Sequence, residues 1–382
     1  MPPAAREGRS REPVAPAVAG AATDSWGTPA RRPVVDVHAH ALLPEVEAVV
    51  AGAEGLAGHR ALDARRNGAG SMSVSGAMIA ERWEQLTDGA RRMADMDAAG
   101  VDVQVISPSP SHYHYWADRD LARMVWTTAN QRIAELVAEH PDRLSGLGLV
   151  PLQHPDLCVE ALDDAVERRL IGIEISSFAP GHPAGTPAVE LSDARLDPLW
   201  ARAAELDVVV FLHPFGCSLD ERLDRFYLSN TVGQPVENAV ALSHLVFSGV
   251  LDRHSGLRVV AAHGGGYLPT YLGRSDHAWT VRSEARGCEQ LPSSYLKRMW
   301  FDSLVHTPEA LRALVQAVGA DRVVLGSDYP FDMGVADPVG RVLAAGLGDA
   351  VDQAVLGVNA SALGLLPAPV PQVGDGVVVP TN

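Results

Sequence analysis

Short apolar runs recur along the chain, and longer stretches with helix-like periodicity separate them. The nearly continuous apolar character of these runs is typical of parallel strands that are buried on both faces. The predicted strands lie at 33–40, 101–107, 144–152, 172–177, 208–214, 257–265, 299–306 and 322–330. The predicted helices lie roughly at 84–99, 118–140, 155–169, 194–206, 235–254, 308–319 and 348–363. This alternation of strands and helices predicts a series of βαβ units.

Eight such units favour a closed barrel over an open doubly wound sheet. We therefore predict an α/β protein with a single TIM-like (β/α)8 barrel over residues 33–366. A dinucleotide-binding sheet would carry a glycine-rich loop after its first strand, whereas here HAH is followed by Ala41-Leu42-Leu43-Pro44. An insertion at about 41–80 is expected to form a lid or a small subdomain, and a second long loop is expected at 177–193.

The composition narrows the class of protein. The chain has 382 residues, 47% of them hydrophobic, and a formal net charge of −16. Lys297 is the only lysine and no basic run occurs, so neither a nucleic-acid partner nor a membrane partner is expected. Three cysteines without C-x-x-C spacing indicate a reduced, cytoplasmic protein. Residues 1–32 are expected to form a disordered leader, and 367–382 a Pro/Gly/Val-rich tail.

Metal-competent side chains stand at the ends of several predicted strands. They are His38, His40, His213, His263 and Asp328. The C-terminal ends of parallel strands converge on one mouth of a barrel. His38 and His40 are two residues apart on a strand, so both project from the same face. An HxH pair alone is weak evidence, but several imidazoles and one carboxylate at a single mouth are plausible ligands of a catalytic zinc ion.

Other polar residues near the strand ends have simpler interpretations. Glu174 lies mid-strand in GIEIS and is expected to be a barrel-interior carboxylate that hydrogen-bonds to its neighbours, so a single metal is favoured over two. His112 and His114 follow the second strand, and packing and substrate contact are equally open as roles for them. His244 lies in an apolar helical run and is interpreted as a core or helix-edge residue.

Five segments, taken in order and at this spacing, resemble the amidohydrolase superfamily: HAH, HPF, AHGGGYLPTYLGR, FDSLVH and GSDYPFDM. Within the superfamily, residues 34–335 are similar to aminocarboxymuconate semialdehyde decarboxylase and its relatives. HAH favours the muconate-semialdehyde type, since the resorcylate type carries Glu-x-His there. The resemblance implies a metal-dependent, non-oxidative decarboxylase that acts on an unsaturated or aromatic carboxylic acid.

The resemblance also implies roles for individual residues. It implies one zinc ion bound by His38, His40, His213 and Asp328, the last of which is also counted as catalytic. It implies that His263 is the general acid/base beside a metal-bound water. Arg274 would bind a substrate carboxylate in the neighbouring subunit of a homodimer. Substrate-binding positions correspond to Trp116, Phe215 and Phe331, with Tyr115 near the pocket.

The residues expected around the substrate depart from the family pattern. An arginine that grips a second carboxylate in the family corresponds to Ala80, and the family's tryptophan after the fifth strand corresponds to Phe215. Candidates to replace the arginine are Arg60, Arg65, Arg66 and Arg82. We therefore expect the namesake substrate to be used poorly. A hydrolase or hydratase with the same ligands is the alternative function, and a non-catalytic metal-binding scaffold is a remote one.

Overall fold

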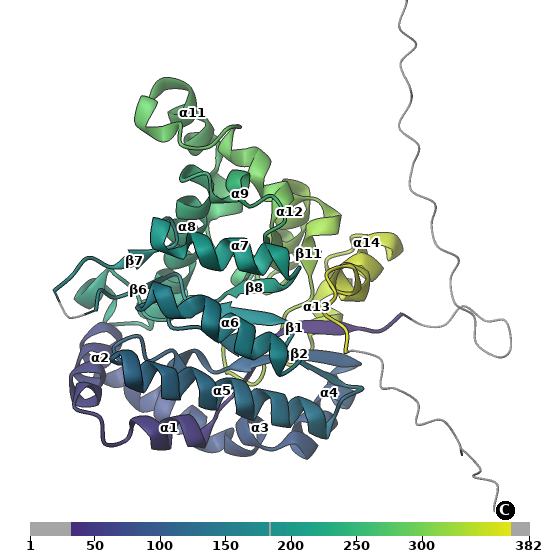
Figure 1. The fold of residues 1–382 in the computed structure, drawn as a ribbon. Helices are drawn as coiled ribbons and strands as arrows, with labels where there is room; N and C mark the ends of the chain where they lie inside the picture. Colours follow the sequence, from purple (N-terminus) through teal and green to yellow (C-terminus); the bar gives the residue numbers. More distant parts are fainter. Residues whose placement is uncertain (1–31, 183–184, 368–382) are drawn as a thin grey trace, which may run out of the picture. The chain divides into compact units, whose positions relative to one another are not determined.

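A ring of parallel strands lies at the centre of the computed structural model, which describes residues 32–182 and 185–367 (Figure 1). The expected leader (1–32) and tail (367–382) therefore lie outside the described residues, apart from Arg32 and Pro367. Around the ring, the strands are β1 (Val35–Ala41), β2 (Val103–Pro108), β3 (Leu144–Gly146) continued by β4 (Gly148–Leu149), β5 (Gly172–Ile175), β8 (Val209–Leu212), β9 (Arg258–Ala261), β10 (Trp300–Asp302) and β11 (Val323–Val324).

Backbone hydrogen bonds close the ring between its last and first strands. Val37 N donates to Leu325 O at 2.9 Å, just beyond β11. Further along, Asp328 N donates to His38 O at 2.8 Å. A closed barrel leaves no strand edge unpaired, and such closure is the structure predicted from the eight apolar runs.

Helices follow the barrel strands, most of them at positions that the periodicity predicts, whereas those at 268–271, 273–281 and 338–344 were not predicted. The helices are α4 (Gly89–Ala99), α5 (Arg119–Glu139), α6 (Cys158–Glu167), α7 (Asp197–Glu205), α8 (Gln234–Phe247), α9 (Val250–Arg253), α10 (Leu268–Tyr271), α11 (Gly273–Val281), α12 (Pro308–Val318), α13 (Pro338–Ala344), α14 (Asp349–Gln353) and α15 (Asn359–Ala362). Thr307 caps α12 by accepting from Ala310 N, and Pro308 occupies its first turn. None of the described helices is both long and apolar enough to cross a bilayer.

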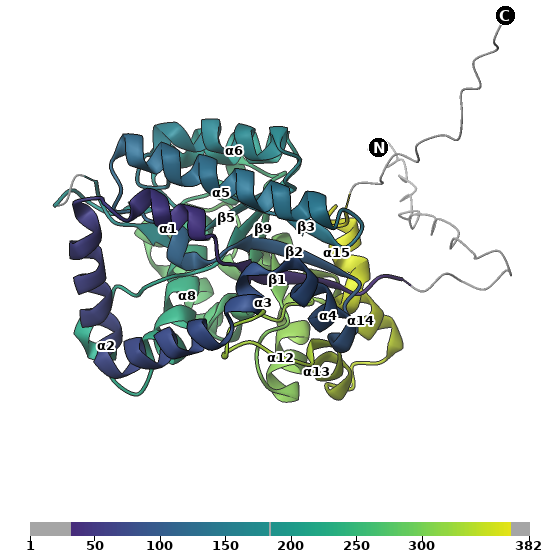
Figure 2. The ribbon, with the colours of Figure 1, turned by 90° about the horizontal axis from the view of Figure 1, so that it is seen from below.

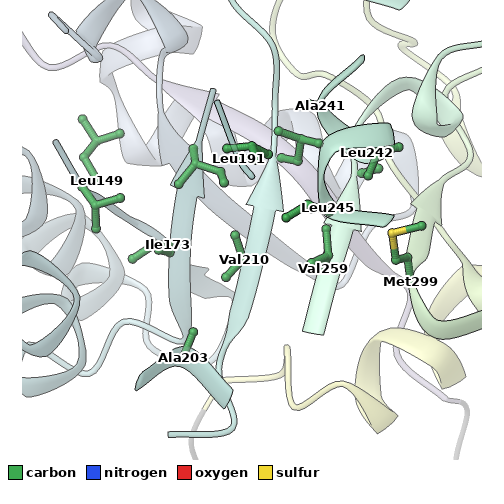
Figure 3. Packing of buried hydrophobic residues seen from close by; sticks show 14 of the residues in the cluster. Leu149, Ile173, Leu191, Ala203, Val210, Ala241, Leu242, Leu245, Val259 and Met299 are labelled. Carbon is green, nitrogen blue, oxygen red and sulfur yellow. The ribbon is translucent and has the colours of Figure 1, made fainter. Parts of the chain in front are cut away.

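Each barrel strand contributes to two apolar layers. On β8, Val210 packs in the layer between strands and helices, whereas Phe211 packs inside the barrel. Figure 3 shows Ile173, Val210 and Val259 side by side in the outer layer. Burial on both faces is the reason that the strands read as continuous apolar runs.

A bulge in β1 turns His38 toward the barrel interior. Asp36 pairs with Gln104, and the next pair is Ala39 with Ile106. Between these pairs β1 advances by three residues and β2 by two. Val37 packs in the interior core, so regular alternation would point His38 outward. The extra residue shifts the phase, and the His38 ring lies 5.1 Å from the Phe211 ring.

The 41–80 insertion, which was expected to form a lid or a small subdomain, is helical. It contains α1 (Pro44–Val50) and α2 (Gly55–Glu81), and α3 (Trp83–Thr87) follows. Figure 2 shows that α2 bends, and the bend lies at Gly68, where φ is 76°. The 177–193 loop contains a short antiparallel pair, β6 (Phe178–Ala179) and β7 (Val189–Glu190), with 183–184 outside the described residues.

Candidate metal centre

Four side chains bring their metal-competent atoms together at the barrel mouth. These atoms belong to His38, His40, His213 and Asp328, and all lie within 4.8 Å of one another. The Nε2 atoms of His38 and His40 are 3.1 Å apart, and each lies 3.3 Å from Asp328 Oδ1. Donors that share one ion at about 2.1 Å lie about 3 to 3.5 Å from each other, so this spacing fits a divalent cation.

Two of these residues carry buried atoms that lack a hydrogen-bond partner within 32–182 and 185–367. They are His213, at both ring nitrogens, and Asp328, at Oδ1. A buried polar atom left unpaired costs about 1–3 kcal/mol. A cation between the four side chains would satisfy these atoms, so the donor set fits a metal on chemical grounds as well as by distance.

Asp302 holds His38 in the orientation that metal binding needs. Its Oδ2 lies 2.6 Å from His38 Nδ1, and its Oδ1 accepts hydrogen bonds from Gly264 N and Leu304 N. A carboxylate on one imidazole nitrogen fixes the tautomer and leaves the other nitrogen free to bind a metal. The sequence analysis did not identify Asp302. It lies within the predicted strand 299–306 but ends β10 in the structure, so a shorter predicted strand would have placed it at the barrel mouth.

The electrostatics of the cluster favour positive charge. Burial by itself would lower the pKa of His38, but the charges of Asp328 and Asp302 outweigh burial and raise this pKa to about 10. Burial lowers the pKa of His40 to about 4. The two carboxylates make the potential at His38 negative, and a negative potential attracts a metal cation, which would take the place of the proton on this ring.

A buried network supports the strand that carries the two neighbouring histidines. Arg92 on α4 donates through Nη2 to His40 O at 2.6 Å and through Nη1 to Gln104 at 2.7 Å. Gln104 in turn donates to Asp36 at 2.9 Å, and Ser327 Oγ lies 2.6 Å from the same carboxylate. The network ties the segment after β11 to β1 and β2, and so holds two strand ends of the site in register.

His263 lies at the edge of the cluster. Its Nε2 is 3.7 Å from Asp328 Oδ2, the carboxylate oxygen turned away from His38 and His40. The His263 side chain is 18% exposed, whereas that of His38 is fully buried. His263 and Asp328 both have left-handed backbones, with φ of 54° and 59°, and strain of this kind is concentrated at functional sites. This position suits a residue that meets substrate.

Glu174 lies behind His40. It is fully buried, and its Oε1 is 3.8 Å from His40 Nδ1, while Ser107 Oγ is 3.1 Å from that nitrogen. The expected hydrogen bonds to neighbours are not formed by either carboxylate oxygen within the described chain, since Tyr113 donates to His213 O instead. Burial holds the pKa of Glu174 well above its usual range. An uncharged acid fits a barrel-interior residue better than a second metal ligand.

Two cavities lie on this side of the barrel, and of the two only the first is lined by a residue of the cluster, Asp328. The first, here called the acid/base cavity, has a volume of about 390 Å³ and is lined by His263, Asp328, His306, Leu314 and Met333 among others. The second, here called the lid cavity, has a volume of about 290 Å³ and is lined by Arg66, Tyr113, Tyr115, Trp116 and Phe215 among others. Trp116 and Phe215, both predicted to bind substrate, thus lie in the lid cavity, whereas the ring of Phe331 lies 5.3 Å from that of His40.

The structure distinguishes among the arginines that could replace the missing clamp. Arg66 lines the lid cavity beside Gly216. Arg60 and Arg65 are exposed on α2. Arg82 donates to Pro330 O at 2.5 Å, so it supports the loop that carries Phe331. Arg66 thus lines a cavity with Trp116 and Phe215, whereas Arg82 lines a separate cavity of about 390 Å³ with Phe331.

Arg274 does not reach the site of its own subunit. It lies on α11, which projects from the barrel in Figure 1 and contains no buried residue. Arg274 is exposed and forms no hydrogen bond or ion pair with any residue that the structure describes. It lines neither of the two cavities defined above. A role in the site of a second subunit is therefore still a prediction.

A second group of metal-competent side chains lies at the end of β2: Glu47, His112 and His114. His112 Nε2 accepts a hydrogen bond from Leu43 N at 2.9 Å, and its Nδ1 is 3.2 Å from Glu47 Oε1. A neutral imidazole that accepts at one nitrogen carries its proton on the other. The proton of His112 is therefore on Nδ1, which faces Glu47, and this arrangement supports a structural role. His114 lines the lid cavity, where substrate contact is still open.

Comparison with known proteins identifies the family. The profile of the family described as Amidohydrolase matches residues 35–363. The chain belongs to this amidohydrolase family. It is 32% identical over 309 residues to 2-amino-3-carboxymuconate-6-semialdehyde decarboxylase of Dictyostelium discoideum, a match that covers 80% of this chain and 83% of that protein.

Two further proteins show the range of relatives. Gamma-resorcylate decarboxylase of Rhodococcus jostii is 29% identical over 252 residues, which cover 63% of this chain and 77% of that protein. The crystal structure of a dihydroxybenzoic acid decarboxylase from a Polaromonas species, with bound manganese and the inhibitor 2-nitroresorcinol, matches with a TM-score of 0.71 at 22% identity. That match covers 87% of this chain and 97% of the other, and it supports the barrel fold.

Proposed function

We propose that this protein is a metal-dependent, non-oxidative decarboxylase of an unsaturated or aromatic carboxylic acid. The observation that carries the proposal is the cluster of four donor atoms within 4.8 Å of one another, with His263 beside it. The relatives named above are decarboxylases, which favours this reaction over hydrolysis or hydration.

Decarboxylation without an oxidant must avoid a free carbanion. A divalent metal held by His38, His40, His213 and Asp328 would supply positive charge that stabilises negative charge on substrate oxygens. His263 would hold a proton at Nε2, where Asp328 Oδ2 orients the ring, and transfer it to the substrate carbon that bears the carboxylate. The bond from that carbon to the carboxylate then breaks, its electrons return to the unsaturated system, and CO₂ leaves. A general acid of this kind contributes about 10²–10⁴-fold in rate.

Zinc is the metal that we propose, because imidazoles with one carboxylate are a common zinc ligand set. Manganese is the rival, since the Polaromonas protein was crystallised with it and donor type alone does not exclude it. Elemental analysis of the purified protein should give close to one zinc per chain. One manganese per chain would show that the metal is manganese, bound at the same site. Only trace amounts of both metals would contradict the proposal that the protein binds a metal.

The proposal includes a homodimer in which Arg274 binds the substrate carboxylate of the partner subunit. The planar arginine fork suits a carboxylate. The exposed side chains of Tyr267 and Tyr271, next to α11, support a protein contact there. Inactive His263→Ala and inactive Arg274→Ala proteins, mixed under conditions that exchange subunits, should recover activity. No recovery despite proven exchange would place Arg274 outside the shared site.

A cytoplasmic location also belongs to the proposal, since all three cysteines are free and buried.

The reaction itself is tested by CO₂ release. The metal-loaded protein would be incubated with a panel of unsaturated and aromatic acids, and CO₂ measured directly. The same panel with His263→Ala protein is the matched control. Release of CO₂ by the parent protein alone supports the proposal. Consumption of a lactone or amide without release of CO₂ would favour the hydrolase alternative.

A further inference from the structure

A fully buried arginine stands behind the candidate metal centre. Arg92 on α4 is 1% exposed and forms no ion pair with any carboxylate in 32–182 or 185–367. Its close acceptors are uncharged: His40 O at 2.6 Å and Gln104 Oε1 at 2.7 Å. Burial of a charge is costly, and well-packed apolar side chains in place of buried ionic groups are often neutral or stabilising. The stability of the fold therefore does not account for the charge of this side chain.

Arg92 completes a triangle of contacts with the two segments that carry neighbouring ligands. Its Nη2 donates to the His40 carbonyl, and its Cζ lies 4.9 Å from the centre of the Tyr329 ring. His40 N in turn donates to Tyr329 O at 2.8 Å. Tyr329 directly follows Asp328, so the three contacts hold the backbones of His40 and Asp328 together. The donor atoms of these two ligands, His40 Nε2 and Asp328 Oδ1, are 3.3 Å apart.

The contribution of Arg92 to the site is geometric and not electrostatic. A positive charge near the site would by itself weaken the binding of a cation. The planar guanidinium fork, however, donates in several fixed directions and stacks on an aromatic face at the same time. Lysine would keep the charge but offers a single nitrogen in place of the fork. The shape of the side chain is therefore the property that suits these contacts.

We propose that Arg92 is a positioning residue of the metal centre, which raises the affinity for the divalent cation by holding His40 and Asp328 at the spacing of two ligands of one ion. Groups that orient metal ligands from behind typically contribute about 10–100-fold in affinity. Arg92 would act through the backbone of one ligand and through the residue after another. This inference rests on the proposed metal site, because it concerns the affinity of that site.

The space around Arg92 allows a test by chemical rescue. The separate cavity lined by Arg82, here called the rear cavity, also borders three residues that Arg92 contacts: Gln85, Gln104 and Tyr329. Asp332 lines the rear cavity and is exposed, so the cavity reaches solvent. Removal of the side chain in Arg92→Ala would enlarge this space. A free guanidinium ion could then enter and donate to the same acceptors.

Cobalt is the probe, because bound Co²⁺ absorbs visible light and reports both affinity and coordination geometry. Its dissociation constant would be measured for the parent protein, Arg92→Ala and Arg92→Lys. Arg143→Ala is the matched control, since Arg143 also donates to backbone carbonyls, those of Asp102 at 2.6 Å and Val101 at 3.1 Å. These carbonyls precede β2, at the end of the strand away from the barrel mouth. Urea unfolding of each protein separates a loss of stability from a loss of affinity.

Arg92→Ala should weaken Co²⁺ binding by about 10–100-fold. Millimolar guanidinium chloride, well below denaturing concentrations, should restore most of the affinity and the parent spectrum, whereas equal sodium chloride should restore neither. Arg143→Ala should bind Co²⁺ as the parent protein does, even where urea unfolds it more easily. If Arg92→Ala does not fold, Arg92→Lys decides, with an expected loss of at least about threefold.

Three results would overturn the inference: parent-like affinity in the deciding Arg92 variant, an equal loss in Arg143→Ala, or a loss in Arg92→Ala that guanidinium does not reverse. A parent protein that binds no Co²⁺ would overturn the inference together with the proposed metal site. Co²⁺ binding that depends on Arg92, in a protein that releases CO₂ from no acid, would support the inference and reject the decarboxylase.

Discussion

Two groups of histidine and carboxylate side chains lie at the ends of neighbouring strands, and their hydrogen bonds give them opposite chemistry. At the end of β1, His38 Nδ1 lies 2.6 Å from Asp302 Oδ2. Its Nε2 is therefore left to face the other metal-competent atoms, with His40 Nε2 at 3.1 Å. At the end of β2, His112 has its Nε2 occupied by Leu43 N and its Nδ1 against Glu47. Residue types and spacing are alike in the two groups. The partner of the second ring nitrogen decides which group presents lone pairs to a cation.

The two groups also differ in how far their charged side chains are exposed to solvent. Around His38, the buried atoms without partners belong to His213 and Asp328, and they lie close enough to share one ion. In the other group, Glu47 is 41% exposed and carries its charge beside solvent. The second group also holds buried ring nitrogens without a hydrogen bond, but His112 Nδ1 and His114 Nε2 lie 3.2 and 3.6 Å from the Glu47 carboxylate. We therefore expect a cation in the first group, where three imidazoles and one carboxylate converge. The predictions below separate these two situations, beginning with the largest expected effect.

Removal of one ligand should abolish metal binding, whereas removal of its counterpart in the second group should not. His38→Ala should lower the metal content from about one per chain to a trace and eliminate activity, since it removes one of four donors and leaves the buried Asp302 carboxylate without its partner. His112→Ala should keep about one metal per chain, because its ring nitrogens are committed to Leu43 and Glu47. Elemental analysis of both proteins decides this. Equal metal loss in the two variants would contradict the distinction drawn here.

Removal of the acid/base residue should affect chemistry without affecting the metal. His263→Ala should lower kcat by about 10²–10⁴-fold, the usual contribution of a general acid or base. Its metal content should stay within error of the parent protein, since His263 faces the oxygen of Asp328 turned away from His38 and His40. If metal and activity fall together, His263 is a ligand and not the acid/base.

The carboxylate behind His38 should tune metal affinity. Asp302→Asn keeps the size of the side chain but removes the charge that fixes the His38 tautomer. Substitution of such a partner lowers metal affinity by about 10–100-fold. Competition with a chelator of known affinity measures the change, with Glu174→Gln as a control that leaves this charge in place. Unchanged affinity in Asp302→Asn would show that the hydrogen bond does not orient the ligand.

The smallest effect is expected in the second group and depends on pH. The neighbouring imidazoles of His112 and His114 lower the pKa of Glu47 below its usual range. A carboxyl group with a lowered folded-state pKa stabilises the fold above its unfolded pKa, and this contribution is lost as pH falls toward the folded value. Glu47→Gln should therefore cost about 0.5 kcal/mol at pH 7, a low figure because the group is exposed to solvent.

Urea unfolding at pH 7 and at pH 3 would show this dependence. The difference between the parent protein and Glu47→Gln should shrink as the pH is lowered. A difference that grows in acid would mean that Glu47 is not ionised against the two histidines. Metal content should be unchanged throughout, in keeping with a structural role for this group.

Much of the architecture could be read from the sequence because barrel strands are buried on both faces. The eight apolar runs and the helices between them lie where the periodicity places them, and closure follows from their number. Strand ends then predict which polar residues meet, since parallel strands end at one mouth. That logic selected His38, His40, His213 and Asp328, whose donor atoms the fold does bring together. Their binding of a metal is still a prediction.

What only the tertiary structure decided depends on contacts between distant segments. The bulge in β1 sets the direction of His38, and the partner of that ring, Asp302, lies 264 residues away in the chain. The state of His112 depends on a hydrogen bond to Leu43, 69 residues before it. Local patterns record which residues are apolar and where strands end. They do not record which nitrogen of an imidazole is protonated and which keeps a free lone pair. That difference separates a histidine that can bind a metal from one that forms structural hydrogen bonds.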